Sequence, residues 1–507
     1  MKDSFLEKVT KKMRTSESTL GLYLGTTEAE GETRKGQSLL DYFEDYMKVL
    51  EDIKNGKFII SGRKGSGKSA IVKYFHDNSS EEKELYTETV KPSDINLEKA
   101  IQYINIPDDD SYTLLYEWII LTKFVKMLLR TNDVRGTKEY CALEQFQRKN
   151  SGLLNVDDWK TLNFQQDESR KVNFSALKSV FNAEIGKNIK TTSIKADFMA
   201  FIPALREIVV KMLHFPGLER FSFYIMFDDL DENFKLSKAS DKKRLLKLIR
   251  ITRSYNTDYL LKTNSMLMIF IRDDVSTQLD GVDTDRAKLF SSYETRINWY
   301  EHYDIAHEEN TLLRKFINKR IGLAFETQGR DYNVEDPWLS LVDNTACDEY
   351  LSRTAFKFIL DFTFYLPRDL LLVFKDLEKK NMQIPIKPDD IKSLLRDYVT
   401  RKEKEITDEL LIQFDDDKDT TDLIISSLRD LSKTNNYSMK DVLVTLNKFG
   451  LDENIFNILL DYNLLIPKDK SGKVYFRYRD QQWEGSIEDY VFTLPKCLYC
   501  YFYPNKI

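Results

Sequence analysis

The chain has 507 residues, which is too long for one compact core and suits two to four domains. Its formal net charge of −6 excludes an overall basic field that would hold nucleic acid or an anionic membrane, so any such contact must be a local patch. Four cysteines are too few for a disulfide scaffold, and four histidines without metal-type spacing disfavour a histidine-based metalloenzyme. The first twenty residues lack a signal-peptide pattern, and we expect a soluble, cytoplasmic, helix-rich protein.

The first 300 residues alternate apolar strands with helices. After an N-terminal segment, 1–37, apolar residues at helical spacing predict a helix over 38–54. The predicted strands are 57–61, 85–90, 221–227, 265–271 and 293–299. The predicted helices between them are 70–75, 113–131, 196–213 and 241–255, and the polar stretch 132–195 is interpreted as a mostly helical insertion. This alternation predicts an α/β core over 38–300, with a parallel sheet covered by helices on both faces.

The second part of the chain loses the strand signals. Residues 301–400 predict a helical lid domain, and the acidic stretch 401–418 is interpreted as a solvated hinge. Beyond it, helices are predicted at 419–433, 437–449 and 452–461, followed by a two-stranded ribbon around residues 470–473. Helices followed by a ribbon are the layout of a winged helix. We therefore expect a winged-helix domain with an aromatic C-terminal tail over 419–507.

Residues 62–69 match the phosphate-loop pattern G-x-x-x-x-G-K-[ST] at every fixed position, between a predicted strand and a predicted helix. Glycines let backbone N–H groups approach phosphate oxygens, and the start of the helix favours the anion. Lys68 would reach the β- and γ-phosphates of ATP, and the Ser69 hydroxyl would ligate Mg²⁺. The alternative is an ordinary glycine turn before a helix. The expected nucleotide-binding residues are Gly62, Arg63, Lys64, Gly65, Ser66, Gly67, Lys68, Ser69 and Ala70.

An acidic pair follows the apolar strand at 221–227. Such a strand end carries the second metal-holding acid of a phosphate-loop enzyme, the Walker B position. Asp228 would hold Mg²⁺ through water, and Asp229 would orient the attacking water as a catalytic residue, with Asp231 nearby. The alternative is a strand that runs into an acidic, solvated loop.

Three arginines are candidate catalytic residues beside Lys68 and Asp229. Arg272 follows the strand at 265–271, which in such a sheet delivers a polar residue to the γ-phosphate; a surface pairing with Asp273 or Asp274 is the alternative. Arg286 occupies the place of an arginine finger for a neighbouring subunit, although a structural role is favoured there. Arg368 lies in the first turn of a predicted helix, where a cation opposes the helix dipole, so a compensating anion or carboxylate is expected.

Two further features are ambiguous. Cys497 and Cys500 have the spacing of half a zinc site, but no second pair lies nearby, and a buried aromatic clamp in the C-terminal tail is favoured. The ribbon, residues 464–480, carries a local charge of about +3 with interleaved tyrosines, which suits phosphate contact as well as packing between domains.

Taken together, these motifs resemble bacterial P-loop ATPases allied to the AAA+ origin-recognition and STAND proteins, many of which occur in anti-phage systems. The resemblance rests on four pieces: 62–70, 223–231, 269–274 and 367–369. Residues 27–31 correspond to the segment that contacts the base in relatives. Two departures stand out. Ser69 and Asp228 are far apart in the chain, which requires a sizeable insertion, and Asp229 replaces the usual Glu, which implies slow hydrolysis.

The resemblance and the residues together favour a nucleotide-controlled switch that binds ATP and Mg²⁺. Arg272 and Arg368 would sense the γ-phosphate, and the output would be assembly into a homo-oligomer or activation of an effector protein, because the sequence shows no second catalytic constellation. The alternative is an initiator- or loader-like ATPase whose winged helix binds DNA. No membrane contact is expected.

Overall fold

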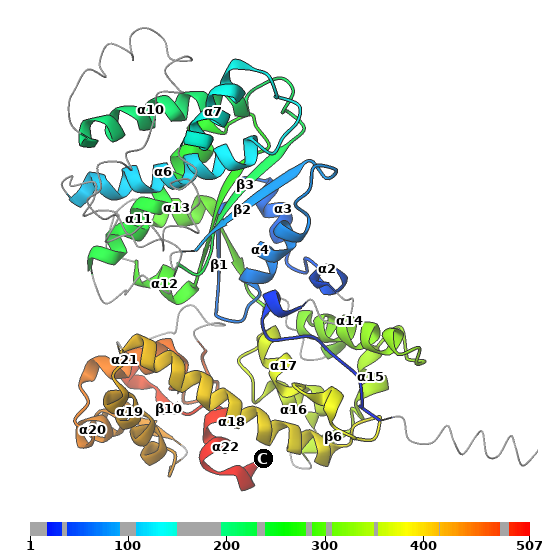
Figure 1. The fold of residues 1–507 in the computed structure, drawn as a ribbon. Coiled ribbons are helices and arrows are strands. Elements are labelled where there is room, and N and C mark those ends of the chain that lie inside the picture. Colours follow the sequence, from blue (N-terminus) through cyan, green and yellow to red (C-terminus); the bar gives the residue numbers. More distant parts are fainter. Residues whose placement is uncertain are drawn as a thin grey trace, which may run out of the picture. The chain divides into compact units, whose positions relative to one another are not determined.

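A computed structural model describes eleven segments of the chain, shown as coloured ribbon in Figure 1. They are residues 18–32, 38–91, 108–149, 194–230, 239–279, 286–300, 307–348, 353–414, 416–434, 436–476 and 486–507. The chain separates into two compact units. We call Met47–Gly62 with Lys68–Ile297 the α/β unit, and Met1–Tyr46, Arg63–Gly67 and Asn298–Ile507 the helical unit.

The α/β unit is built on a five-stranded sheet with the strand order β2-β3-β4-β1-β5, and all its neighbouring strands are parallel. The strands are β1 (Ile59–Gly62), β2 (Leu85–Val90), β3 (Ser222–Phe227), β4 (Met266–Ile271) and β5 (Glu294–Ile297). The five predicted strands are therefore confirmed. Phe58, Ile59 and Ile60 are completely buried, as a central parallel strand requires.

Helices cover both faces of this sheet, as predicted (Figure 1). They are α3 (Val49–Lys54), α4 (Lys68–Asp77), α6 (Asp108–Leu128), α7 (Lys138–Lys149), α10 (Ile194–Leu213), α11 (Ala239–Ser254), α12 (Asp273–Gln278) and α13 (Arg286–Tyr293). Neighbouring residues of β3 contact opposite layers: Tyr224 meets Phe75 of α4, whereas Phe223 stacks on Tyr86 of β2, on the face that α6 covers. The part of the expected insertion from 150 to 193 lies outside the described residues.

The single helix predicted over 38–54 is wrong. The chain forms α2 (Leu39–Tyr42) and α3 instead, because Phe43 is extended and Lys48 adopts a left-handed conformation with φ 56°. Apolar residues at helical spacing on both sides of this break imitate one continuous helix.

The helical unit carries α14 (Leu312–Thr327), α15 (Pro337–Leu341), α16 (Ala355–Leu360), α17 (Pro367–Val373) and α18 (Pro388–Gln413), with a two-stranded pair of β6 (Ala346–Asp348) and β7 (Arg353–Thr354). The acidic stretch that predicted a hinge from residue 401 is helical as far as Gln413. Helix α18 continues because Lys402, Ile406 and Leu410 are spaced four residues apart and are all buried.

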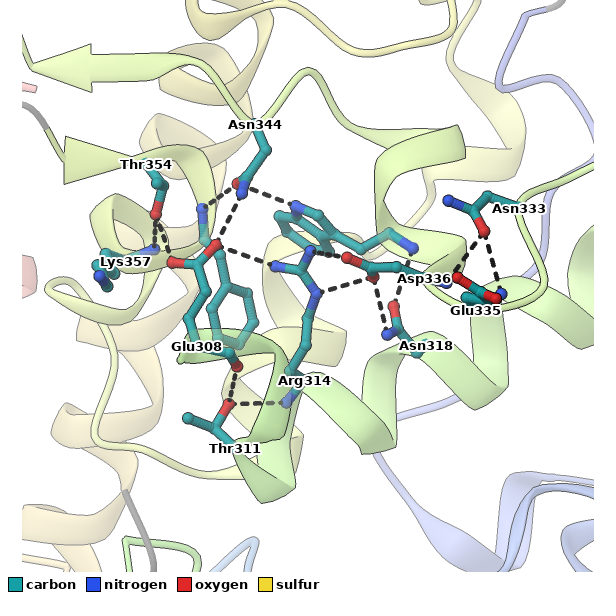
Figure 2. Close-up of polar contacts among 12 residues, drawn as sticks. Glu308, Thr311, Arg314, Asn318, Asn333, Glu335, Asp336, Asn344, Thr354 and Lys357 are labelled. Carbon is teal, nitrogen blue, oxygen red and sulfur yellow. Dashed lines mark hydrogen bonds and ion pairs between the residues drawn. The ribbon is translucent and has the colours of Figure 1, made fainter. Parts of the chain in front are cut away.

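A buried polar cluster organises this unit, and we call it the Arg314 cluster (Figure 2). The Arg314 side chain is 1% exposed and donates from Nε and Nη2 to both carboxylate oxygens of Asp336, at 3.2 and 2.8 Å. Asn344 Nδ2 and Thr354 Oγ1 donate to Glu308, at 2.7 and 2.6 Å. Arg314 Nη1 lies 3.4 Å from Glu308 Oε1, so the guanidinium joins the two carboxylates.

The C-terminal part of the helical unit contains α19 (Lys418–Leu431), α20 (Met439–Lys448), α21 (Glu453–Asp461) and α22 (Lys496–Phe502). Its antiparallel sheet has the order β8-β10-β9, formed by Tyr437–Ser438, Val491–Thr493 and Ile466–Lys468. Strand β9 thus pairs mainly with β10 rather than with the chain directly after the 470–473 turn, where the pairing is a single bridge from Lys468 to Val474. Residues 477–485 lie outside the described residues.

The two cysteines of the tail lie in α22, and both are buried as free thiols. Burial raises the pKa of Cys497 to about 12 and the pKa of Cys500 to about 11. Both side chains belong to the apolar core beneath α16 and α18. Of the helices in the described segments, none has the length and apolar character that a bilayer crossing requires.

Candidate nucleotide site

The phosphate-loop motif forms a tight turn between a buried strand and a helix. Strand β1 ends at Gly62, and α4 begins at Lys68. Gly65 and Gly67 have φ values of +80° and +106°, which side chains other than glycine rarely adopt. Lys68 Nζ donates to the Gly62 carbonyl at 2.9 Å and so closes the loop across its mouth. The motif thus forms a glycine turn between a strand and a helix, the local backbone arrangement from which a phosphate cradle can be built.

Two hydroxyls belong to the same loop and the first turn of α4. Ser66 is 1% exposed, and its Oγ has no hydrogen-bond partner within the described residues. Ser69 lies one residue after Lys68 at the start of α4 and is partly exposed, as is Ala70. A buried hydroxyl without a partner is costly unless a ligand supplies one, so this feature favours an anion acceptor at the loop.

Residues 63–66 of the loop also make contacts within the helical unit. Arg63 Nη1 donates to the Phe364 carbonyl at 2.8 Å, and Lys64 Nζ lies 3.0 Å from Glu409 Oε1 of α18. The Ser66 carbonyl accepts a hydrogen bond of 2.7 Å from Trp299 Nε1. The loop is therefore held from its backbone and from two of its side chains.

Gly65 is required for the approach of Arg368. A Cβ at position 65 would lie 2.9 Å from both Cβ and Cδ of Arg368, closer than real side chains allow. Arg368 is the second residue of α17, and its Nη2 lies 3.0 Å from Glu405 Oε1. The carboxylate expected to compensate this first-turn cation is therefore Glu405. Arg368 Nε is buried and has no hydrogen-bond partner among the described residues, which leaves it a donor for a ligand.

Asp228 lies at the carboxyl end of β3, as the sequence predicts, and is 1% exposed. Its Oδ2 has no hydrogen-bond partner in the described part of the chain. Burial, followed by the neighbouring Asp229 charge, raises the pKa of Asp228 to about 6, whereas Lys68 and Lys91 act in the opposite direction. A buried carboxylate that interacts with the phosphate-loop lysine and keeps an oxygen unused is suited to hold a divalent cation.

Asp229 adopts a left-handed conformation with φ 53°, which Asp tolerates better than most residues. Its Oδ2 lies 2.6 Å from Lys91 Nζ. Sequence reasoning missed Lys91, although one signal was available: it directly follows the predicted strand 85–90, which pairs with β3 up to Val90 and Phe227. The two strand ends therefore place a lysine beside the predicted water-orienting acid.

The two other predicted arginines, Arg272 and Arg286, belong to the α/β unit, whereas Arg368 belongs to the helical unit. Strand β4 lies between β1 and β3, and Arg272 directly follows its end, half-buried, just before α12. Arg286 Nη2 donates to the Ser276 carbonyl at 2.6 Å, and its guanidinium lies over the Phe290 ring. Asp273 pairs with Arg296 at 3.1 Å. Asp231 lies outside the described residues.

The described residues fit a nucleotide with its magnesium ion. The positive φ values of Gly65 and Gly67 and the unpartnered Ser66 hydroxyl are compatible with a phosphate ligand, and the unused oxygen of Asp228 is compatible with a cation. Lys68, Ser69 and Asp228 would hold the phosphates and Mg²⁺. When bound, Mg²⁺ would neutralise charge on the phosphate oxygens.

The fold is that of a P-loop NTPase: a parallel sheet with the phosphate-loop strand between β4 and β5. Residues 31–186 match the sequence profile of a family described as Bacterial TniB protein, which consists of P-loop NTPase-type transposition proteins. The match includes the phosphate loop and covers less than half of the chain. The chain matches no curated protein and no solved structure.

Proposed function

We propose that this protein binds ATP with Mg²⁺, hydrolyses it slowly and acts as a nucleotide-controlled switch. One observation carries the proposal: Lys68, which closes a glycine-rich loop, interacts electrostatically with a buried carboxylate, Asp228, that has an oxygen without a partner. A phosphate loop and a metal-holding acid are the two components that phosphoryl-transfer sites of this fold require. Arg272 and Arg368 are proposed to sense the γ-phosphate, and Arg286 to act from a neighbouring subunit.

Asp229 is the proposed residue that orients the attacking water. Its ion pair with Lys91 holds the carboxylate in place, and the short Asp side chain reaches less far than the usual Glu. Both features support turnover well below the roughly ten per second of a median enzyme.

The test of hydrolysis compares phosphate release with ATP binding in Asp229→Asn. An amide orients water less well and cannot accept its proton, so turnover should fall by about 10²-fold or more while ATP–Mg²⁺ binding persists. The exposed acid Asp408 provides a matched control, and Asp408→Asn should leave turnover unchanged. Wild-type turnover in Asp229→Asn would exclude this residue from catalysis.

The output of the switch is proposed to be assembly with a partner protein or with further copies of the chain. Resemblance to conflict-system ATPases suggests an effector of an anti-phage system as that partner. The match to the TniB family, whose members are transposition proteins, favours a partner that acts in DNA transposition.

A second candidate function is duplex-DNA binding through the C-terminal part. Three helices, α19 to α21, and the sheet order β8-β10-β9 support a winged helix there. With a ribbon charge of about +3, we expect weak, sequence-independent binding with a log–log salt slope of roughly −3. Lys470→Glu with Lys473→Glu should abolish that binding and leave ATP affinity intact. Sequence-selective nanomolar binding at physiological salt would favour the initiator-like alternative instead.

A further inference from the structure

Two carboxylates of α18 hold two cations that border the phosphate loop. Glu409 Oε1 lies 3.0 Å from Lys64 Nζ, and Glu405 Oε1 lies 3.0 Å from Arg368 Nη2. The two acids are four residues apart, so they lie on one face of the helix. Their partners flank Gly65, since Lys64 precedes it and the Arg368 stem covers it. Helix α18 is thus tied to the loop by the Lys64 pair and to α17, whose Arg368 stem lies against Gly65, by the Arg368 pair.

A polyphosphate at the loop competes for both cations. Hydrogen bonds from Lys and Arg to phosphate oxygens are among the strong charge-assisted bonds, and ATP carries more negative charge than one carboxylate. The carboxylate pairs are accessible to such an exchange, because the Lys64 and Glu409 side chains are 39% and 20% exposed. Arg368 also keeps its buried Nε without a hydrogen-bond partner among the described residues. Phosphate bound at the loop would therefore compete with α18 for both cations.

Helix α18 joins two hydrophobic cores of the helical unit. Leu394 and Tyr398, in its first half, pack into the core that includes residues of α14, α16 and α17. Ile406 and Leu410, in its second half, pack into the core of α19, α20 and α21. Glu405 and Glu409 alternate with these two apolar residues along the helix. A change at the two carboxylates therefore acts on the half of α18 that supports the C-terminal part.

A third cation, Lys402, holds α18 in place whether Arg368 pairs with Glu405 or with phosphate. Lys402 is buried, and its Nζ lies 2.9 Å from Asp369 Oδ1 and 3.4 Å from Glu405 Oε2. Burial alone would lower the pKa of Lys402, but the Asp369 and Glu405 charges outweigh it and raise this pKa. Lys402 therefore stays charged and keeps the middle of α18 in place, so that loosening is confined to the residues beyond it.

We propose that Glu405 and Glu409 form a nucleotide-responsive latch. In the absence of nucleotide they fasten the second half of α18 to Lys64 of the phosphate loop and to Arg368 of α17; bound phosphates take over Lys64 and Arg368 and release that half together with α19. The proposal rests on the proposed ATP binding. Because coupling between two sites is reciprocal, a partner that binds the C-terminal part and moves α18 changes ATP affinity by the same factor.

Hydrogen exchange of the full chain, with and without ATP–Mg²⁺, tests the latch. The comparison uses the wild type, the double variant Glu405→Gln/Glu409→Gln, and Asp408→Asn, which removes one charge from an exposed position of the same helix. In the wild type, ATP–Mg²⁺ should accelerate exchange over residues 403–431. The double variant should exchange fast there without nucleotide, show no further response, and bind ATP about two- to five-fold more tightly by calorimetry. Asp408→Asn should follow the wild type.

Three results would count against the proposal. The latch is overturned, with ATP binding itself untouched, if the wild type binds ATP–Mg²⁺ and exchange over 403–431 does not change. It is equally overturned if the double variant retains the full nucleotide response. Absence of ATP binding by the wild type overturns the latch and the proposed function together. Should the double variant fold poorly, the wild-type exchange comparison decides alone.

Discussion

The Arg314 cluster and the phosphate site are both buried and polar, but they differ in how their polar atoms are satisfied. In the Arg314 cluster, the guanidinium, two carboxylates, an amide and a hydroxyl satisfy one another (Figure 2). In the phosphate loop, Ser66 Oγ is buried without a hydrogen-bond partner among the described residues, and so, at the end of β3, is Asp228 Oδ2. The first arrangement stabilises the fold. The second leaves polar atoms unsatisfied within the described residues, as a site that receives a polar ligand would.

The largest effect on stability is expected when the Arg314 cluster loses its cation. Arg314→Ala leaves Glu308 and Asp336 without their cation, and should lower the free energy of unfolding of the helical unit by about 3–5 kcal/mol. Urea denaturation followed by tryptophan fluorescence measures this change, because Trp338 lies under the Arg314 guanidinium. Lys315→Ala, at an exposed position of the same helix, is the matched control.

The same comparison predicts the opposite result for the phosphate loop. Ser66→Ala removes a buried hydroxyl without a partner, so the melting temperature should stay the same or rise slightly. A loss of stability as large as that of Arg314→Ala would show that Ser66 is structural and would remove the distinction between the two regions.

An intermediate effect is expected for Asp228, the proposed metal-holding acid. Asp228→Asn weakens a ligand of Mg²⁺, so ATP affinity in the presence of Mg²⁺ should fall about tenfold or more, equivalent to about 1.4 kcal/mol. Affinity measured with EDTA should hardly change. Thermal melting serves as the control, because replacing a buried charge by a neutral amide should not destabilise the fold. Equal Mg²⁺ dependence in the wild type and the variant would contradict the assigned role of Asp228.

A further effect is the pH dependence of fold stability and of Mg²⁺-dependent ATP affinity. The pKa of Asp228 is raised from 3.8 to about 6, so the folded state binds this proton more tightly than the unfolded state does. Its stabilising contribution is complete below about pH 4 and is lost as the pH rises through about 6. Mg²⁺ requires the charged form, so Mg²⁺-dependent ATP affinity should fall as the pH drops below about 6. Calorimetry between pH 5 and 7.5 checks this trend, which Asp228→Asn should not show.

Local patterns are sufficient to propose most of the candidate nucleotide site. The glycines around Lys68 indicate phosphate binding, and the acidic end of the strand at 221–227 indicates metal binding, each from a few consecutive residues. Lys91 could not be assigned in the same way, because its meeting with Asp229 depends on β2 and β3 being neighbours across a long stretch of chain. The Arg314 cluster could not be predicted from the sequence for the same reason, since Glu308, Asp336 and Asn344 come together only in the folded unit.

In two segments, 401–413 and 38–54, the structure differs from what composition and apolar spacing predict. Acidic residues made 401–413 resemble a hinge, but burial of Ile406 and Leu410 at helical spacing outweighs their solvation. In 38–54 the apolar spacing is nearly continuous, and the break comes from backbone conformations at Phe43 and Lys48 that no apolar pattern marks.

The most direct test of the central claim is calorimetric titration of ATP–Mg²⁺ into the wild type and into Lys68→Ala. Loss of the ammonium removes charge-assisted contacts to phosphate and leaves the loop backbone in place. Lys54→Ala, at an exposed position of α3, is the matched control. The account predicts one ATP bound per chain in the wild type and in Lys54→Ala, with binding abolished in Lys68→Ala. Equal ATP affinity in all three proteins would contradict it.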